Sequence, residues 1–123
     1  MNWPAVGAAL LAAAVGLGAF GAHGLRARLD AYSLGIWEKA VFYHFVHAFG
    51  LLIVPLLART GSLDSTSADR VCWLLAAGVL IFSGSLYVLA VTGIRTLGAV
   101  TPIGGVAFIA AWLLLTVGLL RSR

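Results

Sequence analysis

Four long stretches without Asp, Glu, Lys or Arg are the feature that most constrains what this chain can fold into. Each stretch is long enough for the helix of about 20 residues that crosses about 30 Å of hydrocarbon. In lipid the backbone must satisfy its hydrogen bonds within the segment, so a helix is expected in each. The stretches lie between Met1 and Arg26, Lys39 and Arg59, Arg70 and Arg95, and Arg95 and Arg121.

The composition argues against a water-soluble domain. Hydrophobic residues make up 62% of the chain and charged residues only 10%, whereas soluble domains carry roughly 25% charged residues. We therefore expect an all-α membrane protein in which four transmembrane helices form one compact bundle. The predicted single domain covers residues 1–123, with spans at about 3–22, 36–58, 68–92 and 102–120.

The first span has a second interpretation, a cleaved signal peptide, because Ala19-Phe20-Gly21 offers small residues at a suitable spacing. Against it, no Lys or Arg precedes the apolar run, and the run is longer than the 7–15 residues typical of signal peptides. A membrane span that is kept is the favoured interpretation.

The basic residues predict contact with lipid rather than nucleic acid. The net charge is +4, but the basic side chains flank the apolar runs, where they can reach phosphate head groups. Four spans leave four basic residues on each side of the membrane, so the positive-inside rule sets no orientation. One side has Arg59, Arg70, Arg121 and Arg123, and the other has Arg26, Arg28, Lys39 and Arg95.

The connections between spans carry helix-ending and helix-starting signals. Leu25–Gly35 is expected to lie along the membrane interface as a short amphipathic helix. Thr66 with Asp69 matches a capping box at the start of the third span. Thr101-Pro102 matches an N-cap followed by the first helical residue of the fourth span.

Small residues predict where helices approach closely, since packing in lipid depends on backbone proximity. Ala14, Gly18 and Ala22 recur every fourth residue in the first span, and Gly104 and Gly105 open the last. In the third span, a set of residues that recur at steps of four and three is expected to form the contact line, or seam, with a second helix. Its residues are Cys72, Ala76, Val79, Ser83, Tyr87 and Ala90. Cys72 is the only cysteine and is expected to be a small buried residue.

The second span has two different faces. At 100° per residue, one face carries Glu38, Phe42, Phe45, Phe49 and Ile53, and its phenylalanines are expected to contact lipid. The other is small and polar and is expected to contact protein. It carries Lys39, Ala40, Tyr43, His44, His47, Gly50 and Val54.

Polar residues gather on one side of the predicted membrane protein. With a rise of 1.5 Å per residue, His47 lies roughly 12 Å beyond Lys39, inside the hydrocarbon. Ionisable residues at such depth indicate function by default. We expect a one-sided ligand pocket formed by His23, Tyr43, His47, Ser83, Tyr87 and Arg95.

Three interpretations of the buried histidines remain open. They hydrogen-bond neighbouring helices, they handle a ligand or a proton, or His44 and His47 bind a metal as an i, i+3 pair. The metal interpretation is the weakest, because no HExxH motif, matching carboxylate or cysteine pair supports it. No cofactor is predicted.

An ordered set of short motifs resembles one family. The motifs are Gly18-Ala19-Phe20-Gly21-Ala22-His23-Gly24-Leu25, Tyr43 with His47-Ala48, Phe82-Ser83-Gly84-Ser85-Leu86-Tyr87, and Thr101-Pro102-Ile103-Gly104-Gly105 with Trp112. Together they resemble the family of small bacterial inner-membrane proteins catalogued as domain of unknown function 423, which has distant small mitochondrial transmembrane relatives. The resemblance implies a small four-span protein of the inner membrane and carries no biochemical activity. His44 is not part of the motif, so it is expected to be a bystander.

Two functional hypotheses follow. The favoured one is a non-enzymatic packing or accessory component, which associates with itself or with a larger membrane complex through the small-residue faces of the first and last spans. The alternative is a binder or permease-like protein for a small lipophilic ligand, a proton or a metal. An enzyme is third, because the loops leave little room for a soluble catalytic part.

Overall fold

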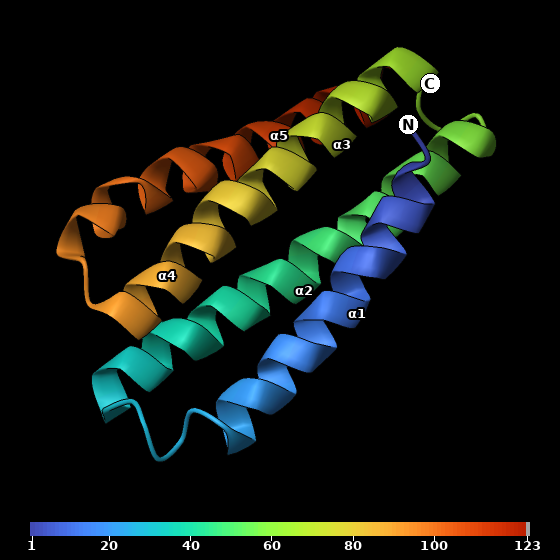
Figure 1. Ribbon diagram of the computed structural model, residues 1–123. Coiled ribbons are helices and arrows are strands. Elements are labelled where there is room, and N and C mark those ends of the chain that lie inside the picture. Colours follow the sequence, from blue (N-terminus) through green and yellow to red (C-terminus); the bar gives the residue numbers. More distant parts are fainter. Residues whose placement is uncertain (123) are drawn as a thin grey trace.

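The computed structural model describes residues 1–122, and its regular structure is helical throughout (Figure 1). Helices α3, η1 and α4 continue into one another, so the chain forms four long rods. Each rod is long and apolar enough to cross a membrane. This confirms the predicted all-α membrane protein with four transmembrane helices. In order, the elements are α1 (Trp3–His23), α2 (Ala31–Arg59), α3 (Ser65–Gly78), the π-helical η1 (Val79–Ser83), α4 (Gly84–Thr92), the 3₁₀-helical η2 (Arg95–Ala99) and α5 (Thr101–Arg121).

Two helical hairpins pack side by side (Figure 1). Helix α1 packs mainly on α2, and α5 packs mainly on α3 and η1, while α2 also packs along α3, η1 and α4. Helix α2 is therefore central, and α1 lies at the edge of the assembly. The N-terminus, the α2–α3 connection and the end of α5 share one end of the molecule.

The faces of α2 match the prediction. Ala40 and Val54 are completely buried, and His47 is 5% exposed. Phe42 and Phe49 are more than half exposed, on the side left for lipid. Lys39 is the exception on the small and polar face, because it is exposed near the start of the helix.

The connection between α1 and α2 differs from the expected interfacial helix. Turns and bends cover the residues after His23, and α2 already begins at Ala31. The reason is the Asp30 side chain, which accepts a hydrogen bond of 2.7 Å from the Ser33 backbone N–H and so caps the helix. This bond lowers the pKa of the exposed Asp30 carboxyl, with a further contribution from the Ser33 side chain.

The predicted capping box at Thr66 is wrong, because Asp64 is the N-cap of α3. Its carboxylate accepts a 2.9 Å hydrogen bond from the Ser67 backbone N–H. Hydrogen bonding with Ser67 lowers the pKa of Asp64. Thr66 lies in the first turn, and Asp69 instead accepts a 2.7 Å hydrogen bond from the Trp3 indole Nε1–H. That bond ties the start of α1 to α3.

Thr101 begins α5 but is not its N-cap. Val100 before it already has helical dihedral angles, because η2 leads almost directly into α5. The Thr101 hydroxyl oxygen lies 2.6 Å from the Ser85 hydroxyl, and it also donates to the Leu97 carbonyl at 3.3 Å. Thr101 therefore joins α5 to α4 rather than capping its own helix.

Four of the six residues predicted for the seam of the third span are buried, whereas Ala76 and Tyr87 are half-buried, and the helix has one feature that periodicity did not predict. Cys72 and Ser83 are completely buried, and Val79 and Ala90 are 3% exposed. Between them, η1 is a single π-helical segment. Such segments are rare and often occur at functional sites.

Candidate functional site

The six residues of the expected pocket do not line one common cavity. His23 is exposed at the end of α1, and Arg95 is exposed at the start of η2. The other four, Tyr43, His47, Ser83 and Tyr87, lie at the contact of α2 with η1, α4 and α5. Tyr43 and His47 belong to one cluster of side chains and Tyr87 to a second, while Ser83 forms a separate hydrogen bond between helices.

The first cluster is aromatic and lies between α2, η1 and α5. The His47 ring stacks on Phe108, with ring centroids 3.5 Å apart and an interplanar angle of 12°. The Tyr43 ring is nearly parallel to the His47 ring, with the ring centroids 5.9 Å apart. It also packs against Phe82, with a centroid distance of 4.5 Å. Nδ1 of His47 lies 2.7 Å from the Tyr43 carbonyl oxygen. Because a carbonyl only accepts, this nitrogen carries the proton.

The second cluster joins α2 to α4. The Tyr87 hydroxyl and Nδ1 of His44 are hydrogen-bonded at 2.9 Å, and the Tyr87 ring lies 4.7 Å from the Trp37 ring. His44 is 4% exposed. Its Nε2 is buried without a hydrogen-bond partner among residues 1–122. The sequence did not predict this contact of His44, which arises because the register of α2 and α4 places it opposite Tyr87.

Ser83 occupies the contact between these two clusters. Its hydroxyl donates a 2.8 Å hydrogen bond to the Ala40 carbonyl of α2. The side chain is completely buried, so its hydroxyl is used in joining helices.

The predicted packing residues are placed unequally. Ala14 is completely buried, and a Cβ at Gly18 would lie 3.4 Å from Val41 of α2. Ala22 is exposed. The buried small residues of α1 are Gly7, Ala14 and Gly21, which recur every seventh residue rather than every fourth.

Gly104 and Gly105 also differ from each other. A Cβ at Gly104 would lie 2.8 Å from Phe82 Cα and 2.7 Å from Phe82 Cβ, so only glycine fits. A Cβ at Gly105 would be 3.8 Å from the Phe82 ring, an ordinary contact. Gly104 is therefore the point of closest approach between α5 and η1.

The histidines do not assemble a metal-binding group within the part of the chain that is described. No three His, Cys, Asp or Glu side chains among residues 1–122 come together in that way. His44 and His47 each use Nδ1 in a bond within the protein.

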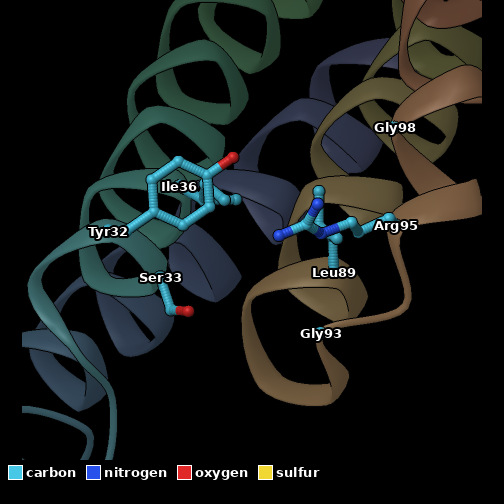
Figure 2. A pocket seen from close by; sticks show the side chains of 7 residues that line it. All are labelled: Tyr32, Ser33, Ile36, Leu89, Gly93, Arg95 and Gly98. Carbon is cyan, nitrogen blue, oxygen red and sulfur yellow. The ribbon is translucent and has the colours of Figure 1, made fainter.

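Arg95 lines a cavity that lies between the first turns of α2 and the end of α4 (Figure 2). The cavity has a volume of about 680 Å³. The sequence placed Arg95 and Tyr32 on this side of the membrane, but the expected pocket included neither Tyr32 nor Ser33. The signal was the four-span parity, which brings the start of the second span and the end of the third to the same side. The lining residues are Tyr32, Ser33, Ile36, Leu89, Gly93, Arg95 and Gly98.

Comparison with known proteins identifies relatives along most of the chain. The chain is 52% identical over 105 residues to the UPF0382 membrane protein SSP2132 of Staphylococcus saprophyticus, covering 85% of each chain. It is 50% identical over 112 residues to UPF0382 membrane protein SH2409 of Staphylococcus haemolyticus, covering 91% of this chain and 89% of the relative. It is 49% identical over 108 residues to UPF0382 membrane protein YwdK of Bacillus subtilis, covering 88% and 87%.

No solved structure matches the chain. The model of the family described as protein of unknown function (DUF423) matches residues 17–105, a region that contains the His44–Tyr87 cluster, Arg95 and the aromatic cluster except for Phe108. This match and the identity of about one half to the UPF0382 proteins confirm the resemblance found in the sequence: the chain is a membrane protein that belongs to the DUF423 family.

Proposed function

We propose that the protein is a non-enzymatic accessory component of the bacterial inner membrane, which associates through the exposed face of α1 with a neighbouring transmembrane helix. The observation that carries the proposal is the size of the side chains on that face. Apart from Val15 and Phe20, the exposed positions within the span are small. They are Ala5, Ala8, Ala9, Ala12, Ala13, Gly16, Ala19 and Ala22.

Helix α5 provides the contrast within the same molecule. Apart from Pro102 and Thr116, its exposed positions within the span carry large side chains suited to contact with acyl chains, such as Ile103, Val106, Ile109, Leu113, Val117 and Leu120. Both helices lie mostly unburied within the chain. The difference in side-chain size supports the proposal that α1 contacts a protein neighbour while α5 contacts lipid.

The physical reason is that transmembrane helices gain little from the hydrophobic effect when they associate. Small side chains let two backbones approach, which strengthens dispersion and weak Cα–H···O contacts. Of the small residues first considered for association, Ala14, Gly18 and Gly104 are used inside the chain, whereas Ala22 is exposed. The proposed contact therefore lies on the exposed face of α1, which includes Ala22.

The short connections support a role without catalysis. Only residues 24–30 and 60–64 separate the first three rods, and the cavity beside Arg95 lies at the helix ends rather than around the histidines. The helical spans support a location in the inner membrane, because outer-membrane proteins are typically β-barrels.

The proposal is tested by the size of the complex that the protein forms after gentle extraction from its native membrane. Gly16→Leu is the test variant, because a Cβ at Gly16 meets nothing within 4 Å and the single chain tolerates it. Gly35→Leu is the matched control, since Gly35 is also exposed and open but lies in α2. We expect native electrophoresis to show a complex larger than one chain for the wild type and Gly35→Leu, and its loss in Gly16→Leu. Migration as a single chain in all three proteins contradicts the proposal.

A further inference from the structure

The cavity beside Arg95 combines cationic, hydroxyl and apolar walls. Figure 2 shows the Arg95 guanidinium directed across the cavity toward the side occupied by Tyr32 and Ser33 of α2. Ile36 and Leu89 line it as well. The two hairpins thus contribute opposite walls, and the volume of about 680 Å³ has room for a small-molecule group.

The polar groups of the cavity are available to a ligand. Arg95 is exposed, and its guanidinium has no hydrogen-bond or ion-pair partner among residues 1–122. Tyr32 is 78% exposed, and its hydroxyl likewise has no partner in this part of the chain. A guanidinium presents several N–H donors in a plane, an arrangement that matches the oxygens of phosphate.

The position of the cavity matches the membrane interface. Helix α4 ends at Thr92, and Arg95 follows three residues later. Ile36 and Leu89 lie about one turn farther toward the hydrocarbon, since one turn of helix rises about 5.4 Å. Tyrosine is enriched at this level of membrane proteins. A ligand with a polar head and an apolar body fits such a gradient.

The surrounding charges favour an anion. By the topology of the rods, this end carries four basic residues and only Asp30 and Glu38 as acids. The Asp30 carboxylate, which lies next in sequence to the cavity wall, accepts a hydrogen bond from the Ser33 backbone N–H and keeps its negative charge, so the excess of basic residues over acids is what favours an anion. The basic residues are Arg26, Arg28, Lys39 and Arg95.

We propose that this cavity binds the phosphate group of an anionic amphiphile, such as a phosphoglycerolipid. Arg95 holds the phosphate, the Tyr32 hydroxyl donates to the head group, and the apolar part lies along Ile36 and Leu89. The proposal is independent of the association through α1, because the cavity lies between α2 and the second hairpin.

The test is binding of dioleoyl phosphatidylglycerol to the full-length protein in detergent, followed by native mass spectrometry. Dioleoylglycerol, which has the same chains without phosphate, is the lipid control, and inorganic phosphate is the soluble probe in a thermal-shift assay. We expect one phosphatidylglycerol per chain to bind, and dioleoylglycerol not to bind at this site.

Two variants should weaken that binding in different ways. Arg95→Ala removes the charge-assisted hydrogen bonds and is expected to weaken binding about tenfold. Gly98→Leu keeps the arginine and fills the cavity, because a Cβ at Gly98 meets nothing within 4 Å. Arg28→Ala is the matched control, an exposed arginine of the same end that does not line the cavity.

The outcomes separate the proposal from its rivals. Loss of phosphatidylglycerol in both test variants but not in Arg28→Ala supports a lipid head-group site. Equal stabilisation by inorganic phosphate, lost in Arg95→Ala, supports the same phosphate site with a soluble ligand as its source. Equal loss in Arg28→Ala shows only a general charge effect and overturns the proposal, as does phosphatidylglycerol binding that neither test variant changes.

Discussion

His44 and Tyr87 join the two hairpins through a single hydrogen bond of 2.9 Å between Nδ1 and the phenolic hydroxyl. The 2.8 Å bond from the Ser83 hydroxyl to the Ala40 carbonyl lies at the same α2 contact. Within lipid, side-chain bonds of this kind supplement packing as a source of helix association. These two hydrogen bonds thus help to fix the register of α2 against η1 and α4.

Removing the Tyr87 hydroxyl is predicted to destabilise the protein. Tyr87→Phe leaves His44 without a partner on either nitrogen, since Nε2 is already unpaired among residues 1–122. The expected loss is about 1 kcal/mol of unfolding free energy, the scale measured for hydrogen bonds between membrane helices. Tyr43→Phe is the control, because the Tyr43 hydroxyl makes no hydrogen bond within the described chain. Reversible unfolding in detergent measures both, and equal values for the two variants would count against the pairing.

Gly104 and Gly105 are predicted to respond differently to the same added methyl group. Gly104→Ala places a Cβ 2.8 Å from the Phe82 backbone Cα and should cost at least about 2 kcal/mol, as overpacking against the backbone does. Gly105→Ala leaves 3.8 Å to the Phe82 ring and should be nearly neutral. Thermal unfolding of both variants provides the comparison. Equal melting temperatures would show that α5 does not approach η1 as described.

His47 is predicted to act through its ring rather than through its basicity. His47→Ala removes the ring stacked on Phe108 and should cost about 2–4 kcal/mol of stability, as for a large-to-small core substitution. His47→Phe keeps a planar ring and should retain most of that stability, although it loses the bond to the Tyr43 carbonyl. A larger loss in His47→Phe than in His47→Ala, measured by unfolding in detergent, would refute the stacking role.

The start of α2 is predicted to loosen at low pH. The hydrogen bond that the Asp30 carboxylate accepts from the Ser33 backbone N–H lowers the pKa of Asp30 below the ordinary value of 3.8. A lowered folded-state pKa contributes stability above the unfolded pKa, and this contribution is lost as the pH falls through the folded-state value. Asp30→Asn accepts the same bond without titrating. Amide exchange at Ser33 and Leu34, compared between the two proteins at each pH, should diverge below about pH 4; identical behaviour would exclude the effect.

The faces of α2 could be predicted from the sequence because they depend only on the 3.6-residue period. Ala40, His47 and Val54 face protein, and Phe42 and Phe49 face outward, as expected. Membership of the family could also be predicted from the sequence, because its motifs are local and occur in a fixed order along the chain.

The pairing of His44 with Tyr87 could not be predicted, because it depends on the register between two helices that are distant in sequence. The π-helical η1 changes that register and leaves no clear trace in the periodicity. Similarly, a repeat of four residues suggested Ala14, Gly18 and Ala22, whereas the contact of α1 with α2 uses a repeat of seven. A seven-residue repeat follows a shallow left-handed crossing, and the crossing angle is a tertiary property.

The most direct test of the proposed function is whether the small face of α1 is shielded from lipid in the native membrane. In a Cys72→Ala background, single cysteines replace Ala12 on this face and Ile109 on the exposed face of α5, and each carries a nitroxide spin label. Collision with molecular oxygen, which dissolves in the hydrocarbon, then reports access to lipid. The account predicts low oxygen accessibility at position 12 and high accessibility at position 109. High accessibility at both positions would contradict it, because α1 would then face lipid as α5 does.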